Sequence, residues 1–148
     1  MGMPEAGACI LCDQSGGQLL AAAKQWRIIA ADDDQGRAFP GFTRIIWQAH
    51  QREMSDLSTT EQGVLMGVVF EVEALMRQHL GPDKINLASL GNHVDHLHWH
   101  VIARWRDDSH FPAPIWASPD VSDAPASRHV VDPSALEGYW QALRERFA

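Results

Sequence analysis

Three histidines at alternate positions, His96, His98 and His100, form the stretch of this sequence best suited to chemistry. Strict alternation with apolar residues is the period of a half-buried β-strand, so we expect the three imidazoles on one face of a strand. Alternate residues on a strand lie about 6.5 to 7 Å apart, which separates the outer two by about 13 Å. Because a single metal ion is too small to bind all three, we expect them to have different roles. Ordinary solvation explains one such histidine better than three in perfect alternation.

The two cysteines of the sequence, Cys9 and Cys12, are spaced C-x-x-C. In a reducing compartment this spacing indicates metal or redox chemistry rather than a structural disulfide. A thioredoxin-like motif would lie at a strand-to-helix junction, whereas this pair precedes a short apolar hairpin, so a metal site is favoured. Two thiolates need two further ligands to complete a tetrahedral site. The alternative is that both cysteines are small buried apolar residues.

The histidine strand needs a sheet around it, and the sequence predicts four further strands. Each is short, and together they are rich in apolar and β-branched residues. Their expected ranges are 19–23, 26–31, 43–47 and 84–90. The acidic run at 32–36 between two of them predicts a solvated turn; a metal site there is the less favoured alternative.

A long helix is predicted in the middle of the chain. Ser58 and Glu61 have the spacing of a capping box at its start, and Gly81-Pro82 ends it. Its apolar residues recur at helical spacing and predict one face that packs in the core or against a second subunit. These residues are Val64, Leu65, Val68, Val69, Val72, Leu75 and Met76.

The sequence after Arg104 becomes irregular over residues 106–132. A connection of this length in a small domain is usually a lid, an arm that binds a partner, or a disordered segment. Phe111, Ile115 and Trp116 favour a docked segment, since aromatic residues are unfavourable in free coil. Asp132-Pro133 then begins a last helix over 133–147. Its inner side is predicted to carry Leu136, Tyr139, Trp140, Leu143 and Phe147.

The composition is that of one globular domain. The 148 residues are 45% hydrophobic and 21% charged, and the net charge of -7 argues against a nucleic-acid partner while allowing a small anionic ligand. No apolar stretch reaches the length of a membrane span, and the first eight residues have no secretory pattern. A cytoplasmic protein without a membrane partner is therefore expected.

Residues 96–102, with the pattern His-φ-His-φ-His-φ-φ in which φ is apolar, resemble the signature of the histidine triad superfamily of nucleotide hydrolases and transferases. The flanking residues resemble it as well, since Asn86 and Gly91-Asn92 lead into the motif and Arg104 follows it. The resemblance covers about residues 9–105. It is most similar to a bacterial branch with Leu-Gly-Asn before the motif and a tryptophan-containing tail after it.

The resemblance implies an α+β fold. This fold has a five-stranded, mainly antiparallel sheet crossed by one long helix, and here a C-terminal helix follows. We expect one domain over residues 1–148, with the core at 9–105, the lid or arm at 106–132 and the last helix at 133–147. Family members commonly form homodimers, so a homodimer is expected.

The resemblance also implies the roles of the motif residues. His98 is expected to attack the α-phosphorus of a nucleotide substrate and form a nucleotidyl-histidine intermediate, which needs no cofactor. His100 is the second catalytic candidate, and it is expected to bind the substrate phosphate together with Asn86 and Asn92. His93 is an odd number of residues from the three alternating histidines, so it does not share their face, and it is expected in a loop.

A structural zinc site is the expected role of the remaining candidates. Cys9 and Cys12 need two imidazoles, and His96 is the triad histidine nearest the entry to its strand. His50 follows the strand at 43–47, where zinc-containing branches of the family carry a ligand. A tetrahedral site of these four residues would tie the N-terminal segment to the sheet.

One position departs from the family pattern. Members often have a Gly-His pair before the strand at 43–47, with the histidine in the phosphate site, whereas this chain has Gly41-Phe42. Two alternatives to the triad enzyme therefore stay open. The first is a metal-dependent hydrolase that uses the histidine cluster, although the one acid of the motif, Asp95, is on the other face. The second is a non-catalytic nucleotide-binding protein or zinc-stabilised scaffold.

Overall fold

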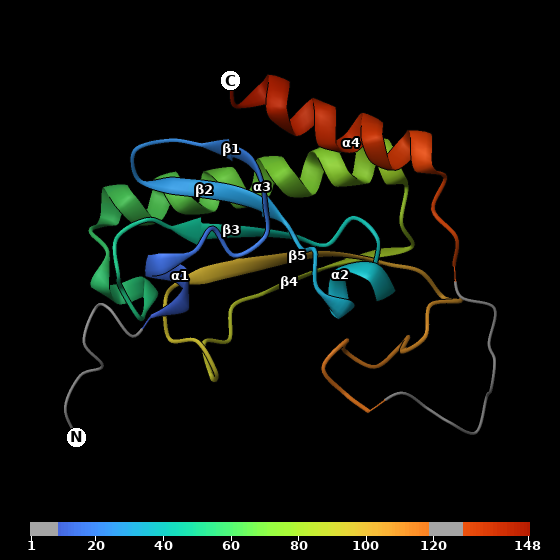
Figure 1. Ribbon diagram of the computed structural model, residues 1–148, viewed down its shortest axis with the longest axis horizontal. Helices are drawn as coiled ribbons and strands as arrows, with labels where there is room; N and C mark the ends of the chain where they lie inside the picture. The colour runs from blue at the N-terminus through green and yellow to red at the C-terminus, as the bar shows by residue number, and fades with distance from the viewer. Residues whose placement is uncertain (1–8, 119–128) are drawn as a thin grey trace.

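Five antiparallel strands form a single sheet in the order β1-β2-β3-β5-β4 in the computed structural model, which describes residues 9–118 and 129–148 (Figure 1). This sheet confirms the α+β fold predicted from the sequence. The histidine-bearing strand lies between the strand that starts after Phe42 and the edge strand that contains Asn86. The strands are β1 (Gln18–Ala22), β2 (Trp26–Ala30), β3 (Thr43–Trp47), β4 (Lys84–Ala88) and β5 (His98–Arg104).

Helices α3 (Thr59–Leu80) and α4 (Pro133–Arg146) lie side by side against one face of the sheet (Figure 1). The capping box predicted at the start of α3 is present, because the Ser58 side chain accepts from the Glu61 N–H and the Glu61 side chain accepts from the Ser58 N–H. The helix ends at Gly81, whose φ of 58° is the left-handed conformation that glycine adopts at lowest cost.

The main hydrophobic core fills the space between these helices and the sheet. Side chains of the predicted apolar face of α3 and of the last helix are buried there against alternate residues of the strands. Val64 is the exception on α3, because it is exposed. The Tyr139 hydroxyl hydrogen-bonds with the Thr43 hydroxyl at 2.9 Å and so joins α4 to β3. The fully buried members of this core are Ile28, Ile45, Leu65, Val69, Val72, Met76, Val101, Ala103, Tyr139 and Leu143.

The opposite face of the sheet is covered by short elements and loops. They include α1 (Ile10–Asp13) and α2 (Asp34–Ala38), while the 3-10 helix η2 (Met54–Asp56) precedes α3. Two small apolar clusters lie on this face. Cys9, Leu11, Ile29 and Ile46 form one cluster, and Phe39, Phe42, Ile102 and Ile115 form the other.

The acidic run at 32–36 is not only a solvated turn, as the sequence predicted. The Asp33 carboxylate accepts a hydrogen bond from the Gly36 N–H at 3.0 Å and caps α2. Aspartate is among the best N-cap residues, because its oxygen satisfies an N–H that the helix leaves free. The run is therefore partly helical, because α2 begins at Asp34.

The histidine strand is shorter at its start than the alternation predicted. Strand β5 begins at His98, and His96 lies in a bend before it. The chain at Leu97 pairs outside the β-ladder, since its N–H donates to the Gln51 carbonyl and its carbonyl accepts from the Trp47 N–H. Strand β4 likewise ends at Ala88, two residues before its predicted end.

The irregular segment predicted at 106–132 is described up to residue 118 and from 129, and its middle lies outside the described residues. Ile115 is buried against Phe39, Phe42 and Ile102, which confirms that this part of the segment docks. Within the described parts of the chain, no helix is long and apolar enough to cross a membrane.

Candidate functional site

His98 and His100 lie on the sheet face that the two long helices leave uncovered. Leu97 and Val101 are buried in the core on the other face, so the predicted alternation holds. The two imidazole rings are 4.9 Å apart between centroids and nearly perpendicular, at 86°. Both side chains are buried. The strand therefore presents two adjacent imidazoles to the same space.

The tautomer of His98 follows from its hydrogen bond. Its Nδ1 lies 2.5 Å from the carbonyl oxygen of His96, and a carbonyl can only accept, so Nδ1 carries the proton. The lone pair is then on Nε2. Burial lowers the pKa of His98, and the nearby charge of Arg44 lowers it further, although the hydrogen bond to the His96 carbonyl opposes this. His98 is thus a neutral imidazole with a free nucleophilic nitrogen at pH 7.

His100 is the residue whose polar atoms are least satisfied. Its side chain is 5% exposed, and burial, His98 and Arg44 lower its pKa to about 3. Its Nδ1 is buried and has no hydrogen-bond partner among the described residues. The rings of Phe42 and Trp116 lie edge-on to it, at 5.4 and 5.0 Å between centroids. A buried polar atom without a partner costs stability and is typical of a site that is completed by a ligand or by water.

The two asparagines predicted to bind substrate are differently placed. Asn86 is on β4, and its Oδ1 accepts from Arg104 at 2.9 Å. Asn92 is exposed in the loop before β5, where it lines an open pocket of ≈ 420 Å³ with Gly91 and His93. His93 is exposed in this loop, as predicted. Neither asparagine is hydrogen-bonded to a motif histidine in the described parts of the chain.

The four residues predicted as metal ligands come together at the entry to β5. Their ligand atoms all lie within 4.8 Å of one another. The Nδ1 of His96 is 3.4 Å from Cys9 Sγ and 3.5 Å from Cys12 Sγ, and the Nδ1 of His50 is 3.3 Å from Cys12 Sγ. Such a group can hold a metal ion.

The donor set and the His96 tautomer both suit a metal. Nε2 of His96 donates to the Trp47 carbonyl at 2.5 Å, which leaves the lone pair on Nδ1, the atom that faces the sulfurs. Two thiolates and two imidazoles are a common tetrahedral set for zinc. The cluster contains no carboxylate. A tetrahedral ion held by all four residues would have no open coordination position.

Arg27 supports this cluster and was not identified from the sequence. It is buried under the C-x-x-C segment, where its guanidinium donates to the carbonyls of Leu11, Gln14 and Ser15. It also donates to Gln48 Oε1 at 2.6 Å. An arginine inside an otherwise apolar strand was the one available signal, because a buried guanidinium needs several acceptors.

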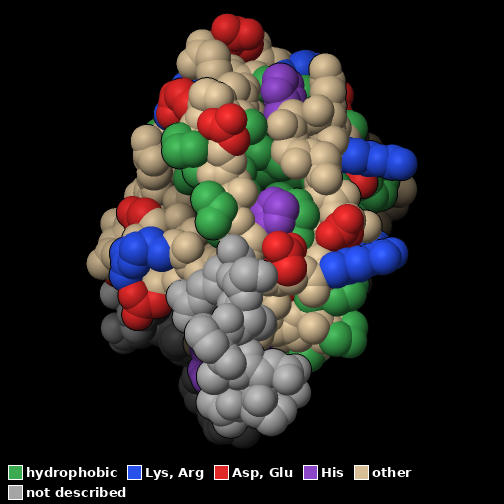
Figure 2. All heavy atoms as spheres, turned by 90° about the vertical axis from the view of Figure 1, so that its right-hand side faces the viewer, with side chains coloured by type: hydrophobic (Ala, Val, Ile, Leu, Met, Phe, Trp, Pro, Cys, Tyr) green, Lys and Arg blue, Asp and Glu red, His purple; other side chains and the backbone are tan. Residues whose placement is uncertain are grey.

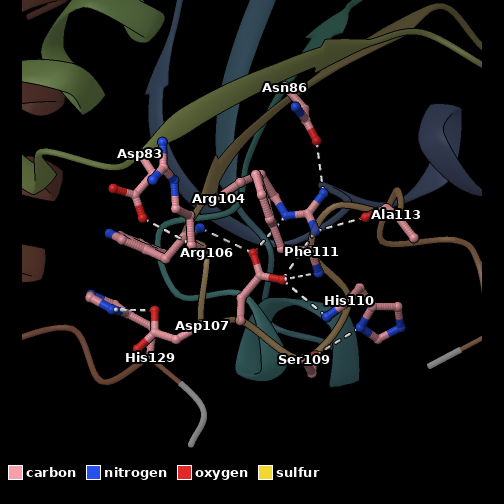
Figure 3. A network of polar contacts seen from close by, with 12 residues as sticks. Asp83, Asn86, Arg104, Arg106, Asp107, Ser109, His110, Phe111, Ala113 and His129 are labelled. Carbon is pink, nitrogen blue, oxygen red and sulfur yellow. Dashed lines mark hydrogen bonds and ion pairs between the residues drawn. The ribbon is translucent and has the colours of Figure 1, made fainter. Parts of the chain in front are cut away.

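A second buried arginine anchors the segment that follows the motif (Figure 3). Arg104 pairs with Asp108, at 2.8 Å from its Nε and 3.1 Å from its Nη2 to the two carboxylate oxygens. It also donates to the Ala113 carbonyl and to Asn86. Asp108 accepts in addition from the backbone N–H groups of residues 105, 110 and 111. We refer to Arg104 and Asp108 as the clasp.

The clasp determines what lies in front of His100. It folds residues 108–116 back over the sheet, so that Ile115 is buried and Trp116 contacts the His100 ring. The chain returns at His129, which stacks on Trp105 with 4.3 Å between ring centroids. The sequence predicted the docked apolar residues but not Asp108, because its role depends on the fold of a loop without periodicity.

Comparisons with known proteins bear on the family and the fold. The sequence model of a family described as the HIT domain matches residues 27–107. A search of curated proteins finds no match. The chain is similar to a solved histidine triad protein from Bradyrhizobium japonicum, with a TM-score of 0.68 and 23% identity over 90% of this chain and 92% of that one.

Two further solved structures are similar to the same extent. A histidine triad protein from Marinobacter aquaeolei has a TM-score of 0.69 and 23% identity, over 90% of this chain and 93% of that one. A histidine triad (HIT) protein from Sinorhizobium meliloti has a TM-score of 0.65 and 24% identity, over 90% and 91%. At these identities the likeness establishes a shared fold.

Proposed function

Because the chain belongs to the HIT domain family of nucleotide-binding hydrolases and transferases, we propose that it hydrolyses or transfers a nucleotide at its α-phosphorus through His98. The observation that carries the proposal is the orientation of this ring. Its Nδ1 is committed to the His96 carbonyl and its Nε2 has no partner among the described residues. A neutral imidazole held in one tautomer can attack phosphorus without prior deprotonation.

The reaction takes two steps. In the first, the Nε2 lone pair of His98 forms a bond to the α-phosphorus, and the bond from phosphorus to the leaving group breaks. The leaving group departs with the electron pair and takes a proton from solvent. The His98 ring becomes cationic, and its Nδ1–H still donates to the His96 carbonyl, which stabilises that charge. In the second step, the oxygen of water or of another acceptor forms a bond to phosphorus and its proton passes to solvent. The bond from phosphorus to Nε2 breaks, and its electron pair returns to the ring, which is neutral again.

The role proposed for His100 is to bind the phosphate. Its unpartnered, buried nitrogen and its position beside His98 support this role. As a neutral imidazole it offers one donor and one acceptor. The amide nitrogen of Asn86 and the exposed side chain of Asn92 stay proposed as further substrate contacts. The homodimer, the cytoplasmic location and the absence of a nucleic-acid partner also stay predictions of the sequence.

Zinc is the metal proposed for Cys9, Cys12, His50 and His96. The ion would supply a cross-link between the N-terminal segment, the end of β3 and the entry to β5. This arrangement supports a structural role rather than a metal-dependent hydrolase, since four protein ligands leave no place for a reactive water.

A nucleotide-binding protein without turnover is the second candidate. The observation that favours it is Phe42, which is 1% exposed and packs its ring against His100 at a position where many members have a histidine. Trp116 covers another edge of the same ring. A site reduced in this way can retain binding while its chemical step is slow.

The test compares wild type with His98→Ala and, as a control, with His93→Ala in the exposed loop. Nucleoside phosphoramidates, dinucleoside polyphosphates and nucleotide sugars are offered, and intact mass reports any nucleotide adduct. We expect turnover and an adduct in wild type and in the His93 variant, and neither in the His98 variant. Binding without turnover or adduct in wild type would favour the second candidate. Loss of the bound metal in the His98 variant would favour the metal-dependent hydrolase.

A further inference from the structure

We propose that Arg44 binds the substrate phosphate beside His98 and His100, an inference that rests on the nucleotide chemistry proposed above. Nothing in the motif assigns a role to this arginine. It lies on β3, 52 residues before the first motif histidine, counted from 44 to 96. Its placement beside the imidazoles comes from the pairing of β3 with β5.

The register of these strands puts Arg44 directly across from His100, and Ile46 directly across from His98. Residues opposite each other in an antiparallel pair have Cβ atoms about 4.5 to 5.5 Å apart and project from the same face. The Arg44 side chain is therefore a neighbour of the imidazole pair. Burial and His98 lower the pKa of His100, and the charge of Arg44 lowers it further, which agrees with this proximity.

The guanidinium is held in place but is not saturated. Its central carbon lies over the Phe42 ring, 4.6 Å from the centroid, and its Nη2 donates to Asp33 Oδ2 at 3.3 Å. The Arg44 side chain makes no other hydrogen bond within residues 9–118 and 129–148, so most of its five N–H donors are free. The other Asp33 oxygen caps α2. Phe42 and Asp33 thus fix the orientation of a cation whose donors are available.

Space for a ligand lies beside this cation. Arg44 and Asp33 line an open pocket of ≈ 500 Å³ together with residues of the N-terminal segment and the loop before β5, including Leu11, Gly16 and Val94. Its volume is in the usual range for sites that bind small molecules, about 300 to 1,000 Å³. The Arg44 side chain is 14% exposed, so solvent and ligands can reach it.

The negative charge of a bound phosphate explains why a cation is needed at this place. His100 is neutral at pH 7, because burial lowers its pKa to about 3. A phosphate bound beside this ring without a cation would bring an uncompensated negative charge into a partly buried site, which is costly. A guanidinium balances that charge and can donate two parallel hydrogen bonds to phosphate oxygens.

The experiment separates phosphate binding from nucleoside binding. The probes are the four common nucleoside monophosphates and the matching nucleosides, titrated calorimetrically into wild type, Arg44→Gln and Arg44→Lys. The matched control is Arg37→Gln, which removes a nearby exposed arginine that pairs with Asp34 on α2. We expect Arg44→Gln to weaken monophosphate binding by about 10- to 100-fold with nucleoside binding unchanged. The lysine variant should keep part of the affinity, and Arg37→Gln all of it.

Three results would overturn the proposal. The first is that Arg44→Gln binds monophosphates as tightly as wild type does. The second is that it loses affinity equally for nucleosides and monophosphates, which indicates a structural role. The third is that wild type binds no monophosphate. The unfolding midpoint of each variant is measured alongside, and the lysine variant carries the test if the glutamine variant does not fold. The calorimetric measurement of binding does not depend on turnover. If the wild type is inactive but Arg44→Gln still weakens monophosphate binding, the proposed catalysis is refuted and the Arg44 site is supported.

Discussion

The cysteine–histidine cluster and the imidazole pair of His98 and His100 are built from alternate residues of one short stretch, yet they differ in how their polar atoms are used. In the cluster, both ring nitrogens of His96 have partners, one at the Trp47 carbonyl and the other at the two sulfurs. In the pair, Nε2 of His98 and the buried Nδ1 of His100 have no hydrogen-bond partner within the described residues. A saturated group of donors can only hold, whereas an unsaturated pair can bind and react.

The surroundings of the two regions explain the difference. The N-terminal segment and the end of β3 bring three further ligands to His96, all within 4.8 Å. Aromatic rings and the clasp-bound segment surround His100 instead, and they supply no hydrogen bond to it. Acidic and basic side chains are interspersed over the end of the molecule shown in Figure 2, without a large patch of one sign.

The test with the largest expected effect replaces two neighbouring motif histidines one at a time. His98→Ala should lower turnover at least about a thousandfold, because it removes the proposed nucleophile. The content of the proposed metal should stay, and the unfolding free energy should change by about 1 kcal/mol. His96→Ala should remove the metal and destabilise the fold. Metal analysis, denaturant unfolding and turnover of both variants decide the question. Equal loss of metal in both would mean that the two regions are one site.

Removal of the proposed metal tests the structural role of the cysteine–histidine cluster by itself. Cys9→Ser, or incubation with a chelator, should lower the unfolding free energy by several kcal/mol, because the cross-link from the N-terminal segment to the sheet is lost. Denaturant unfolding with and without added zinc measures this, and His93→Ala serves as the control. A chelator-treated protein that is as stable as the untreated one would refute the proposed structural role of a metal.

The next test measures how much the clasp, which holds the segment beside His100, contributes to stability. Arg104→Met should cost about 3 to 5 kcal/mol, because it leaves the Asp108 carboxylate buried without its cation. Arg37→Met breaks an exposed pair with Asp34 and should change stability by about 0.5 kcal/mol at most. Unfolding of both variants gives the difference. Similar values for the two would show that the clasp contributes no more than a surface pair.

The smallest expected effect is a pH dependence of stability that comes from the imidazole pair. His100 has a pKa of about 3 when folded and an ordinary value of 6.5 when unfolded, so between these values only the unfolded chain takes up the proton. Stability should therefore fall as the pH is lowered below 6.5, by about 1.4 kcal/mol per unit from this residue. Comparing wild type with His100→Leu between pH 6.5 and 4.5 isolates the contribution. An unchanged slope would place the His100 ring in contact with solvent.

The local sequence determined much of this protein. The alternation of apolar and histidine residues set the shared face of His98 and His100, the capping box and Gly81 set the ends of α3, and apolar spacing set the inner sides of α3 and α4. These features depend on residues within one or two turns of each other, so the chain encodes them directly. The C-x-x-C pair needs two further ligands to complete a tetrahedral site, and the sequence predicted His96 from its place at the strand entry and His50 from the resemblance.

Only the tertiary structure decided the features that join distant segments. The position of Arg44 beside His100 follows from the register of β3 on β5, and the clasp and the contacts of Arg27 follow from loops without periodicity. Local spacing carries no information on such partners, because strand register and loop docking are set by the packing of the whole chain. For the same reason the sequence predicted a strand through His96, whereas in the fold this residue leaves the ladder and lies among the sulfurs.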